Sequence, residues 1–156
     1  MSVINQINNN KMNIIELENL ELQTFTEQDV VDYCQINNLN PDNITELWLR
    51  NNELTDISGI KEFKNLEELY LFNNKLTDIS IIKIFKNLRH LNIGYNLIKD
   101  ISVIKYLNNL KYLNIKYLEL ESDQIQYINS LKKLEELLCK DGFKKFKEFR
   151  GFKHRL

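Results

Sequence analysis

The most constraining feature of the sequence is a 22-residue unit that recurs in fixed register. Copies start at Ile44, Leu66, Leu88 and Leu110, and a fifth, imperfect copy starts at Leu134, two positions later than the period predicts. Each copy carries Leu or Ile with the spacing L-x-x-L-x-L-x-x-N-x-L or a close variant of it. A single unit of this kind cannot bury its own apolar face, so successive units must stack on one another.

The middle of each unit predicts a short strand with one buried face. Alternation in LWL, LYL and LNI places every second side chain on the same side of an extended chain. Strands of successive units then lie side by side in a parallel sheet, above a core filled by the rest of each unit. The predicted core residues are Leu47, Leu49, Leu54, Ile57, Ile60 and Phe63 and their counterparts in the following copies, Leu69, Leu71, Leu76, Ile79, Ile82, Phe85, Leu91, Ile93, Ile98, Ile101, Ile104, Leu107, Leu113, Ile115 and Leu120.

Two polar positions also recur and have a predicted structural role. Asn52, Asn74 and Asn96 follow the strand, where a buried amide can bond backbone groups that the end of the strand leaves open. Leu118 replaces this asparagine in the fourth unit, and two residues are inserted within 121–124, so a local deviation is expected there. The recurring aspartates are predicted to cap short helical or 3₁₀ turns; they are Asp56, Asp78 and Asp100.

The repeat resembles the leucine-rich-repeat family, whose period is about 20 to 29 residues. The unit ending D-I-S-x-I-x-x-F-x-N is similar to the 22-residue subclass that includes the protein-phosphatase-1 regulatory subunit and the internalins. The resemblance covers Ile44 to about Cys139. It implies an α/β solenoid, a right-handed superhelix with short parallel strands on its concave face, and a role in binding.

The segments that flank the repeats are predicted to cap the solenoid. Residues 13–43 form an N-terminal cap region, in which a helix starts at Thr26 and stops at Asn40-Pro41. Ile14 to Leu22 forms an additional strand or a second cap segment, although the 22-residue repeat does not extend backwards from Ile44. The apolar stripe expected on the helix is Val30, Val31, Cys34 and Ile36. Residues 1–12 form a flexible Asn-rich N-terminus, 44–141 the repeats, and 142–156 a basic C-terminal cap rich in Phe.

The outward side chains of the strands are the predicted partner-binding site. Aromatic residues and arginine dominate binding hot spots, and adjacent exposed apolar residues mark interaction surfaces. The predicted site residues are Trp48, Arg50, Tyr70, Phe72, His90, Tyr95, Tyr112, Lys116 and Tyr117. Alternatively, some of these rings pack against one another or against the termini, or serve only as good strand formers. Under the binding hypothesis, Trp48→Ala and Tyr70→Ala weaken partner binding with little loss of stability.

The C-terminal tail carries a charge opposite to that of the rest of the chain. From Lys140 to Leu156, seven Lys/Arg against two acidic residues give +5, whereas the whole chain carries −1. Basic residues interleaved with Phe can bind nucleic acid or an anionic membrane surface. The predicted anion contacts are Lys144, Lys145, Lys147, Arg150, Lys153 and Arg155. A cap with Phe inward and Lys outward is the favoured alternative.

Motifs for catalysis, metal binding or membrane insertion are absent from the sequence. It contains no GxGxxG, P-loop, HExxH or CxxC motif, and its only histidines are His90 and His154. Cys34 and Cys139 are far apart and are expected to be reduced thiols. No apolar run approaches the roughly 20 residues that span a bilayer. We therefore expect a monomeric, non-catalytic protein without cofactor or metal, in the cytoplasm or nucleus.

Three functions fit these patterns. The favoured one is a protein–protein interaction module, a scaffold or regulatory subunit, that binds another protein on its concave aromatic face. The second is a ribonucleoprotein or ribosome-associated factor anchored by the basic tail, whose RNA binding would depend strongly on salt. The third is an internalin-like surface adhesin whose signal peptide is missing from this sequence.

Overall fold

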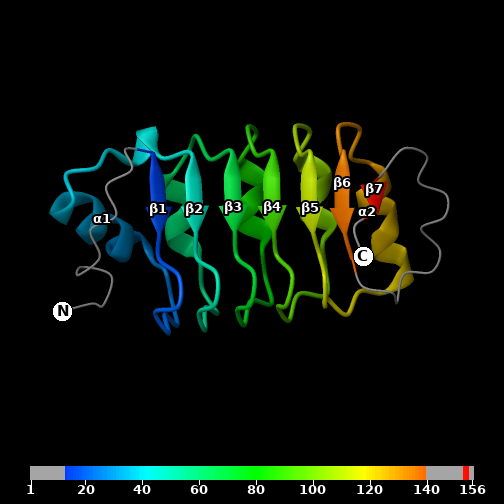
Figure 1. Ribbon diagram of the computed structural model, residues 1–156, viewed down its shortest axis with the longest axis horizontal. Coiled ribbons are helices and arrows are strands. Elements are labelled where there is room, and N and C mark those ends of the chain that lie inside the picture. Colours follow the sequence, from blue (N-terminus) through cyan, green and yellow to red (C-terminus); the bar gives the residue numbers. More distant parts are fainter. Residues whose placement is uncertain (1–12, 140–152, 155–156) are drawn as a thin grey trace.

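The computed structural model of the chain describes residues 13–139 and the backbone of residues 153–154. Its strands form one parallel sheet in the order of the sequence (Figure 1). The strands are β1 (Ile14–Glu16), β2 (Glu46–Trp48), β3 (Glu68–Tyr70), β4 (His90–Asn92), β5 (Tyr112–Asn114), β6 (Glu136–Leu138) and β7 (Lys153–His154). The parallel sheet of stacked repeats confirms the predicted leucine-rich-repeat type of solenoid.

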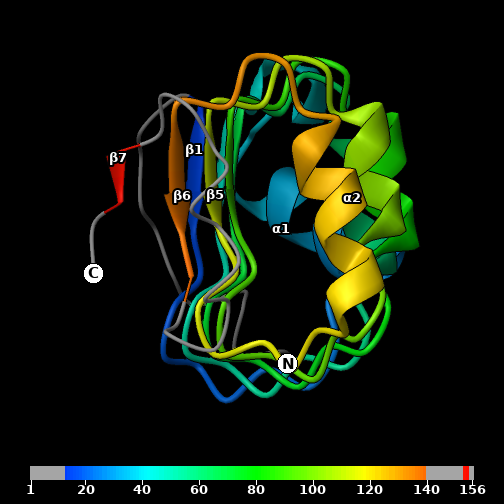
Figure 2. The ribbon, with the colours of Figure 1, turned by 90° about the vertical axis from the view of Figure 1, so that its right-hand side faces the viewer.

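Strands β1 to β5 each begin one coil of the solenoid, and the helices lie on the side opposite the sheet (Figure 2). We number the coils 1 (14–45), 2 (46–67), 3 (68–89), 4 (90–111) and 5 (112–135). The α-helices are α1 (Glu27–Ile36) and α2 (Ile125–Asn129), and the 3₁₀ helices are η2 (Pro41–Asn43), η3 (Ser58–Glu62), η4 (Ser80–Ile84), η5 (Ser102–Tyr106) and η6 (Ser122–Gln124).

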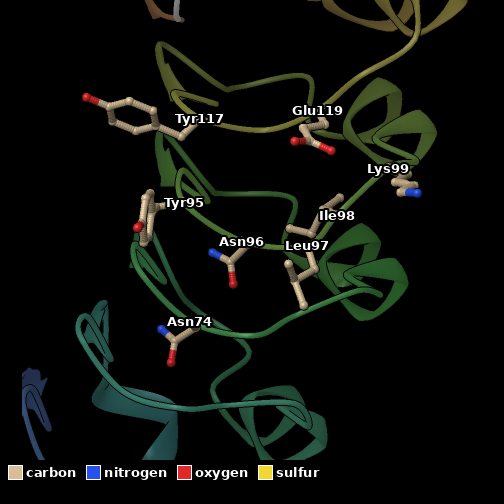
Figure 3. Close-up of a pocket in the computed structure, with 8 residues that line it drawn as sticks. All are labelled: Asn74, Tyr95, Asn96, Leu97, Ile98, Lys99, Tyr117 and Glu119. Atoms are coloured by element: carbon tan, nitrogen blue, oxygen red, sulfur yellow. The ribbon is translucent and has the colours of Figure 1, made fainter.

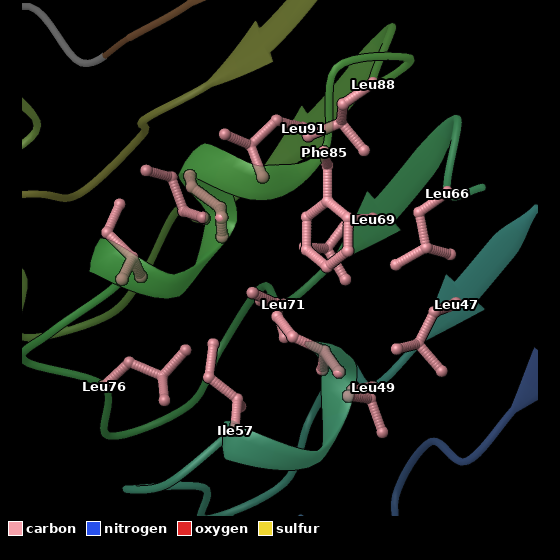
Figure 4. Close-up of a cluster of buried hydrophobic side chains, with 14 of the residues drawn as sticks. Leu47, Leu49, Ile57, Leu66, Leu69, Leu71, Leu76, Phe85, Leu88 and Leu91 are labelled. Atoms are coloured by element: carbon pink, nitrogen blue, oxygen red, sulfur yellow. The ribbon is translucent and has the colours of Figure 1, made fainter. Parts of the chain in front are cut away.

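The 22-residue period places identical positions of neighbouring coils opposite each other. Leu47 pairs with Leu69, which pairs with Leu91 and then with Leu113, and each of these side chains is fully buried. Figure 4 shows leucines of coils 2 to 4 gathered with Ile57 and Phe85 between the sheet and the 3₁₀ helices. The predicted core is confirmed except at Leu120, which is only partly buried.

A ladder of asparagines joins the coils at the end of each strand. The Asn74 amide donates to the carbonyls of Leu49 and Leu71 at 2.9 and 3.0 Å, and its oxygen accepts from the Leu54 N–H at 3.0 Å. Asn52 and Asn96 bond the backbone in the same way. The predicted structural role of these residues is therefore confirmed, because each satisfies backbone groups of two coils that would otherwise be buried without partners.

The recurring aspartates act one residue earlier than predicted. Asp56 accepts a hydrogen bond from the Ser58 N–H at 2.8 Å, and Asp78 and Asp100 repeat this contact with Ser80 and Ser102. The N-cap of η3 is Ile57, and it forms no side-chain cap. The aspartates thus form turns that lead into the 3₁₀ helices, instead of occupying the N-cap position.

Coil 1 is a structural repeat that the 22-residue spacing concealed. Ile14 pairs with Glu46 in the sheet, and Leu17 and Phe25 are fully buried in the common core. The paired residues lie further apart in sequence than the regular period, because α1 replaces the short 3₁₀ helix of later coils and packs against η3. The expected additional strand is present, and it begins a longer coil that precedes the 22-residue repeats.

Gly59 allows coil 1 to pack closely on coil 2. A Cβ atom at this position would lie 2.3 Å from the carbonyl oxygen of Thr26 and 2.8 Å from that of Phe25. The Gly59 N–H also donates to the Phe25 carbonyl at 2.8 Å. Ile81 and Val103 occupy the equivalent position in coils 3 and 4, so only the contact with coil 1 demands glycine.

The helix expected from Thr26 is present and carries a complete capping box. Thr26 accepts from the Asp29 N–H, and the Asp29 carboxylate accepts from the Thr26 N–H. The helix ends at Ile36 and not at Asn40-Pro41, because Pro41 instead begins η2. The predicted stripe is half correct, since Val30 and Cys34 are buried, together with Tyr33, whereas Val31 and Ile36 are exposed.

The chain deviates from the regular coil after β5, as predicted. Leu118 is buried, and the inserted residues lead through η6 into α2, which packs against η5. Gln124 reaches back to accept from the Ile101 N–H at 3.0 Å. Strand β6 then resumes the register, and β7 pairs parallel to it. The predicted Phe-rich cap falls outside the described residues, apart from the backbone of β7.

Candidate functional site

The nine predicted partner-binding residues lie along the outer face of the sheet and at the turns that follow the strands. Their backbones belong to coils 2 to 5, and the buried middle residue of each strand directs its two neighbours outward. We call this set the aromatic face. Its members are Trp48, Arg50, Tyr70, Phe72, His90, Tyr95, Tyr112, Lys116 and Tyr117.

The first part of the aromatic face is a cluster of two rings and a guanidinium. The Trp48 and Tyr70 rings have centroids 5.1 Å apart, and the Arg50 guanidinium lies 4.6 Å from the Trp48 centroid and 5.6 Å from that of Tyr70. Glu18 of coil 1 forms an ion pair with Arg50 and holds the guanidinium in place. Among the described residues, no acceptor bonds the Trp48 indole N–H.

Glu68 links this cluster to the centre of the face. The Tyr70 hydroxyl donates to the Glu68 carboxylate at 2.6 Å. Burial first, and then this hydrogen bond, raise the pKa of Tyr70 well above its ordinary value. Nδ1 of His90 lies 3.1 Å from Oε1 of Glu68, within ion-pair distance but without hydrogen-bond alignment. The His90 ring in turn packs on Tyr112, with centroids 6.0 Å apart.

The second part of the face is a row of three rings at the turns after the strands. Phe72 and Tyr95 have centroids 6.0 Å apart, and Tyr95 meets Tyr117 edge to face at 5.6 Å. The Lys116 ammonium lies 5.2 Å from the Tyr117 centroid. Gly94 makes room for this row, because a Cβ atom there would lie 3.2 Å from the Phe72 ring and 2.8 Å from the Lys116 carbonyl oxygen.

Tyr95 and Tyr117 occupy left-handed backbone positions that the other coils give to asparagine. Their φ angles are 54° and 65°, and the equivalent residues Asn19, Asn51 and Asn73 have φ angles of 59°, 55° and 57°. Asparagine tolerates this conformation well, whereas for a bulky side chain it is an outlier that costs stability. Tyrosine at these two positions therefore strains the backbone.

The prediction of jointly exposed aromatics is only partly correct. Tyr95 and Tyr117 are 54 % and 42 % exposed, but Trp48, Tyr70, Phe72 and Tyr112 are half-buried because they pack against one another or against neighbouring charges. The sequence did not predict Glu16 and Glu18 as members of this face. They lie beside Trp48 and Arg50 because coil 1 is longer than the 22-residue period. With Glu46 and Glu68 they make this end of the face acidic.

A pocket adjoins the row of rings. It has a volume of about 350 Å³ and is lined by Asn74 of coil 3, by residues 95–99 of coil 4, and by Tyr117 and Glu119 of coil 5. Figure 3 shows Tyr95 on one side and Leu97 and Ile98 further along the same coil, with Tyr117 and Glu119 on the next. Leu97 is 60 % exposed at its edge. Sequence reasoning did not identify this pocket.

Other predicted features lie partly outside the described residues. The basic contacts Lys144, Lys145, Lys147, Arg150 and Arg155 fall there, and only the backbone of Lys153 is described. Cys34 is a free, buried thiol, and Cys139 is partly buried. Within residues 13–139, no group of His, Cys, Asp and Glu is placed to hold a metal ion, and no described helix has the length and hydropathy to cross a bilayer.

Comparison with known proteins agrees with this architecture. Residues 42–83 match the family model for leucine-rich repeats in two copies. A leucine-rich-repeat protein of Leptospira interrogans is 30 % identical with a TM-score of 0.63, over 78 % of this chain and 29 % of that one. No curated protein matches the chain.

Two internalins of Listeria monocytogenes share the fold at lower identity. Internalin InlF is 21 % identical with a TM-score of 0.69, over 92 % of this chain and 45 % of its own. Internalin C2 is 21 % identical with a TM-score of 0.55, over 81 % of this chain and 60 % of its own. The chain therefore spans less than two thirds of the length of each relative.

Stacked parallel strands, a repeated core and asparagine turns define the class as a repeat solenoid. Residues 42–83 match the leucine-rich-repeat family, and the described chain has the leucine-rich-repeat fold. Proteins of this class typically act by binding other proteins on extended surfaces. The finer resemblance to the phosphatase regulator stays a prediction.

Proposed function

We propose that the chain is a non-catalytic protein-interaction module, a scaffold or regulatory subunit, that binds its partner on the aromatic face. The observation that carries the proposal is the Trp48–Arg50–Tyr70 cluster, because it combines the residue types that dominate binding hot spots. The Glu18 ion pair and the contact between the tilted rings hold these side chains in place, and less side-chain freedom is then lost when a partner binds.

The charges of the face indicate the kind of partner. Glu16, Glu18, Glu46 and Glu68 surround the cluster, and Arg50 is the basic residue among them. A partner surface with basic groups around an apolar centre would complement this arrangement, since complementary charge favours specific encounter. We place the protein in the cytoplasm or nucleus, in line with the free thiol of the buried Cys34.

An affinity pull-down from lysate of the source cell tests the proposal. Wild type is compared with Trp48→Ala/Tyr70→Ala and with Tyr106→Ala, which removes a 46 % exposed ring on the opposite side of the solenoid. We expect a protein that wild type and Tyr106→Ala retain in high salt and that the double variant retains about tenfold less or worse. Circular dichroism checks that the double variant is folded, since both rings are half-buried.

Two outcomes would contradict the proposal. Retention of every partner by the folded double variant would exclude the cluster as the binding site. Recovery of RNA that is released at high salt and is indifferent to the double substitution would support the ribonucleoprotein hypothesis, in which the basic tail makes the contacts. The adhesin hypothesis rests on likeness to internalins, which at 21 % identity concerns the fold alone.

A further inference from the structure

The helical side of coils 3 to 5 carries lysines with no acidic residue among them. Residues 79–88, 101–110 and 125–134 contain five lysines and neither Asp nor Glu. These three segments lie next to one another, because η5 packs against both η4 and α2 on the side opposite the sheet (Figure 2). We call the exposed surface that they form the basic patch. Its lysines, all exposed, are Lys83, Lys86, Lys105, Lys132 and Lys133.

Uncharged acceptors hold two of these ammonium groups in place. Nζ of Lys86 donates to the carbonyl of Lys83 at 2.8 Å, and Nζ of Lys133 donates to Oδ1 of Asn109 at 2.7 Å. The Asn109 amide in turn donates to the Lys86 carbonyl at 2.8 Å, so this network joins coils 3, 4 and 5. A hydrogen bond to a neutral oxygen fixes the position of an ammonium group but leaves its charge in place.

The positive charge of the basic patch is not balanced within the described part of the chain. Three other exposed lysines form ion pairs with glutamates; they are Lys61, Lys75 and Lys111. None of the lysines of the basic patch forms an ion pair with a residue that the structure describes. Like charges gathered on one surface repel one another, and a bound anion removes that repulsion.

Exposed apolar side chains lie among these lysines. Ile84 and Tyr106 occupy equivalent positions of coils 3 and 4 and are 41 % and 46 % exposed. The ammonium groups of Lys105 and Lys86 lie 5.1 and 5.7 Å from the Tyr106 ring centroid, and Lys105 also lies 5.7 Å from the centroid of Tyr127. Adjacent exposed apolar residues mark interaction surfaces. The basic patch therefore combines an apolar contact with positive charges around it.

The basic patch and the aromatic face carry opposite charges. Four glutamates gather at the N-terminal end of the aromatic face, whereas the basic patch lies across the solenoid, on the helices of coils 3 to 5. A partner on the sheet therefore leaves the helical side uncovered (Figure 2). The two surfaces also select differently, because complementary charge favours a basic partner on one and an acidic partner on the other.

We propose that the basic patch binds an acidic peptide segment of a second protein, in which Asp or Glu side chains flank an apolar residue. The carboxylates pair with the ammonium groups of Lys86, Lys105 and Lys133, and the apolar side chain packs on Ile84 and Tyr106. This inference goes beyond the proposed function, because a protein with a partner on each side bridges two proteins of opposite charge.

The composition of the basic patch favours carboxylates over nucleic acid. Its basic residues are all lysines, whereas arginine is the residue best suited to the paired hydrogen bonds that recognise phosphate groups. Ile84 supplies an aliphatic surface and not an aromatic ring on which a base can stack. An acidic segment with an apolar residue complements both features.

The test titrates the ¹⁵N-labelled full chain with the peptide acetyl-EEELEEE-amide at low salt and follows the amide signals by NMR. We expect shifts centred on residues 83–86, 105–109 and 127–133. The dissociation constant should be about 0.1 to 1 mM and should rise about tenfold in high salt. The uncharged peptide acetyl-QQQLQQQ-amide should bind about tenfold more weakly. The peptide acetyl-EEEGEEE-amide, which lacks the apolar side chain, should bind several-fold more weakly.

Two double variants with the same change in net charge locate the site. Lys86→Gln/Lys105→Gln should weaken binding of the acidic peptide about tenfold. Lys75→Gln/Lys99→Gln removes two exposed lysines outside the basic patch and should bind nearly as wild type does. Equal losses in the two variants, shifts centred elsewhere, or tighter binding of single-stranded poly(U) than of the acidic peptide at these residues would overturn the proposal.

Failure of the basic patch and failure of the aromatic face are distinguishable. Trp48→Ala/Tyr70→Ala leaves the basic patch intact and should bind the acidic peptide as wild type does, whereas Tyr106→Ala should bind it several-fold more weakly. If the acidic peptide does not bind wild type, the basic patch proposal fails, and the pull-down with Trp48→Ala/Tyr70→Ala still decides the proposed function.

Discussion

The two ends of the solenoid terminate the same repeat in opposite ways. At the N-terminal end, Asn52 continues the ladder into coil 1, where it bonds the Leu17 carbonyl at 2.7 Å and the N–H groups of Leu20 and Leu22 at 2.9 and 3.2 Å. Toward the C-terminal end, Leu118 stops the ladder, and the Ile98 N–H has no hydrogen-bond partner within the described part of the chain. One side-chain amide per coil therefore decides whether the backbone groups at a junction are paired.

The largest effect is expected when Asn52 is replaced by leucine, the residue that coil 5 carries at the equivalent position, 118. Asn52→Leu removes the bonds to Leu17, Leu20 and Leu22 and leaves several buried backbone groups unpaired, at a cost of about 4 kcal/mol in the free energy of unfolding. Urea denaturation followed by circular dichroism and by fluorescence of Trp48, the single tryptophan, measures it. A loss below about 1 kcal/mol would show that the ladder does not hold the coils together.

The next effect concerns the close packing of coil 1. Gly59→Val places a branched side chain against the carbonyl oxygens of Thr26 and Phe25 and should cost about 2 to 3 kcal/mol. Val103→Ile, at the equivalent position of coil 4, is the control and should change stability by less than about 1 kcal/mol. Urea denaturation measures both substitutions. If they have equal effects, coil 1 can move away from position 59 without a loss of stability.

An exchange of residues at the left-handed turns gives a smaller effect. Asn73→Tyr introduces strain and removes the hydrogen bond from Asn73 to Asn51, so stability should fall by about 1 kcal/mol. Tyr117→Asn removes the ring contacts with Tyr95 and Lys116 but also relieves strain, and its net change should lie within about 0.5 kcal/mol. Urea denaturation measures both, and a loss above about 1.5 kcal/mol for Tyr117→Asn would show that the ring serves the fold.

A further effect is a pH dependence confined to the N-terminal end. Burial raises the pKa of the Cys34 thiol from 9.0 to about 11, and burial likewise raises the pKa of Tyr33. The folded state favours the protonated thiol, so this stability is fully present below pH 9 and is lost as pH rises through 11. Cys34→Ala should flatten the decline in unfolding free energy between pH 9 and 11. An unchanged slope in this variant would contradict the assignment to Cys34.

Most of coils 2 to 4 was predictable because their spacing is regular. A 22-residue register determines which residues share a column, and alternation within each strand then separates core from surface, as at Leu69 and Tyr70. The predictions failed where the spacing changes. Coil 1 escaped notice because α1 lengthens it beyond the regular period, and Glu18 was missed with it. A sequence pattern also cannot show that Tyr33 turns inward while Val31 faces solvent.

The sequence predicted which residues form the candidate site but not how their side chains pack. The nine residues lie where the columns place them, yet whether neighbouring rings stack or stand apart depends on rotamers and on charges from other coils, such as Glu68 beside Tyr70. The pocket was not predicted, because its lining residues come from three coils and their relative positions follow from the packing of those coils. The leucine at position 118 was visible in the sequence, but the groups it leaves unpaired became visible only in three dimensions.

The uniform register of coils 2 to 4 has a consequence for how such a chain can change in length. Every strand pairing there joins equivalent positions of successive repeats, and the asparagine bonds recur with the same interval. An additional copy of the repeat between Asn65 and Leu66 would find matching partners on both sides. Tandem duplication can therefore extend the binding surface in steps of about 4.8 Å, the distance between neighbouring strands, without any compensating substitution.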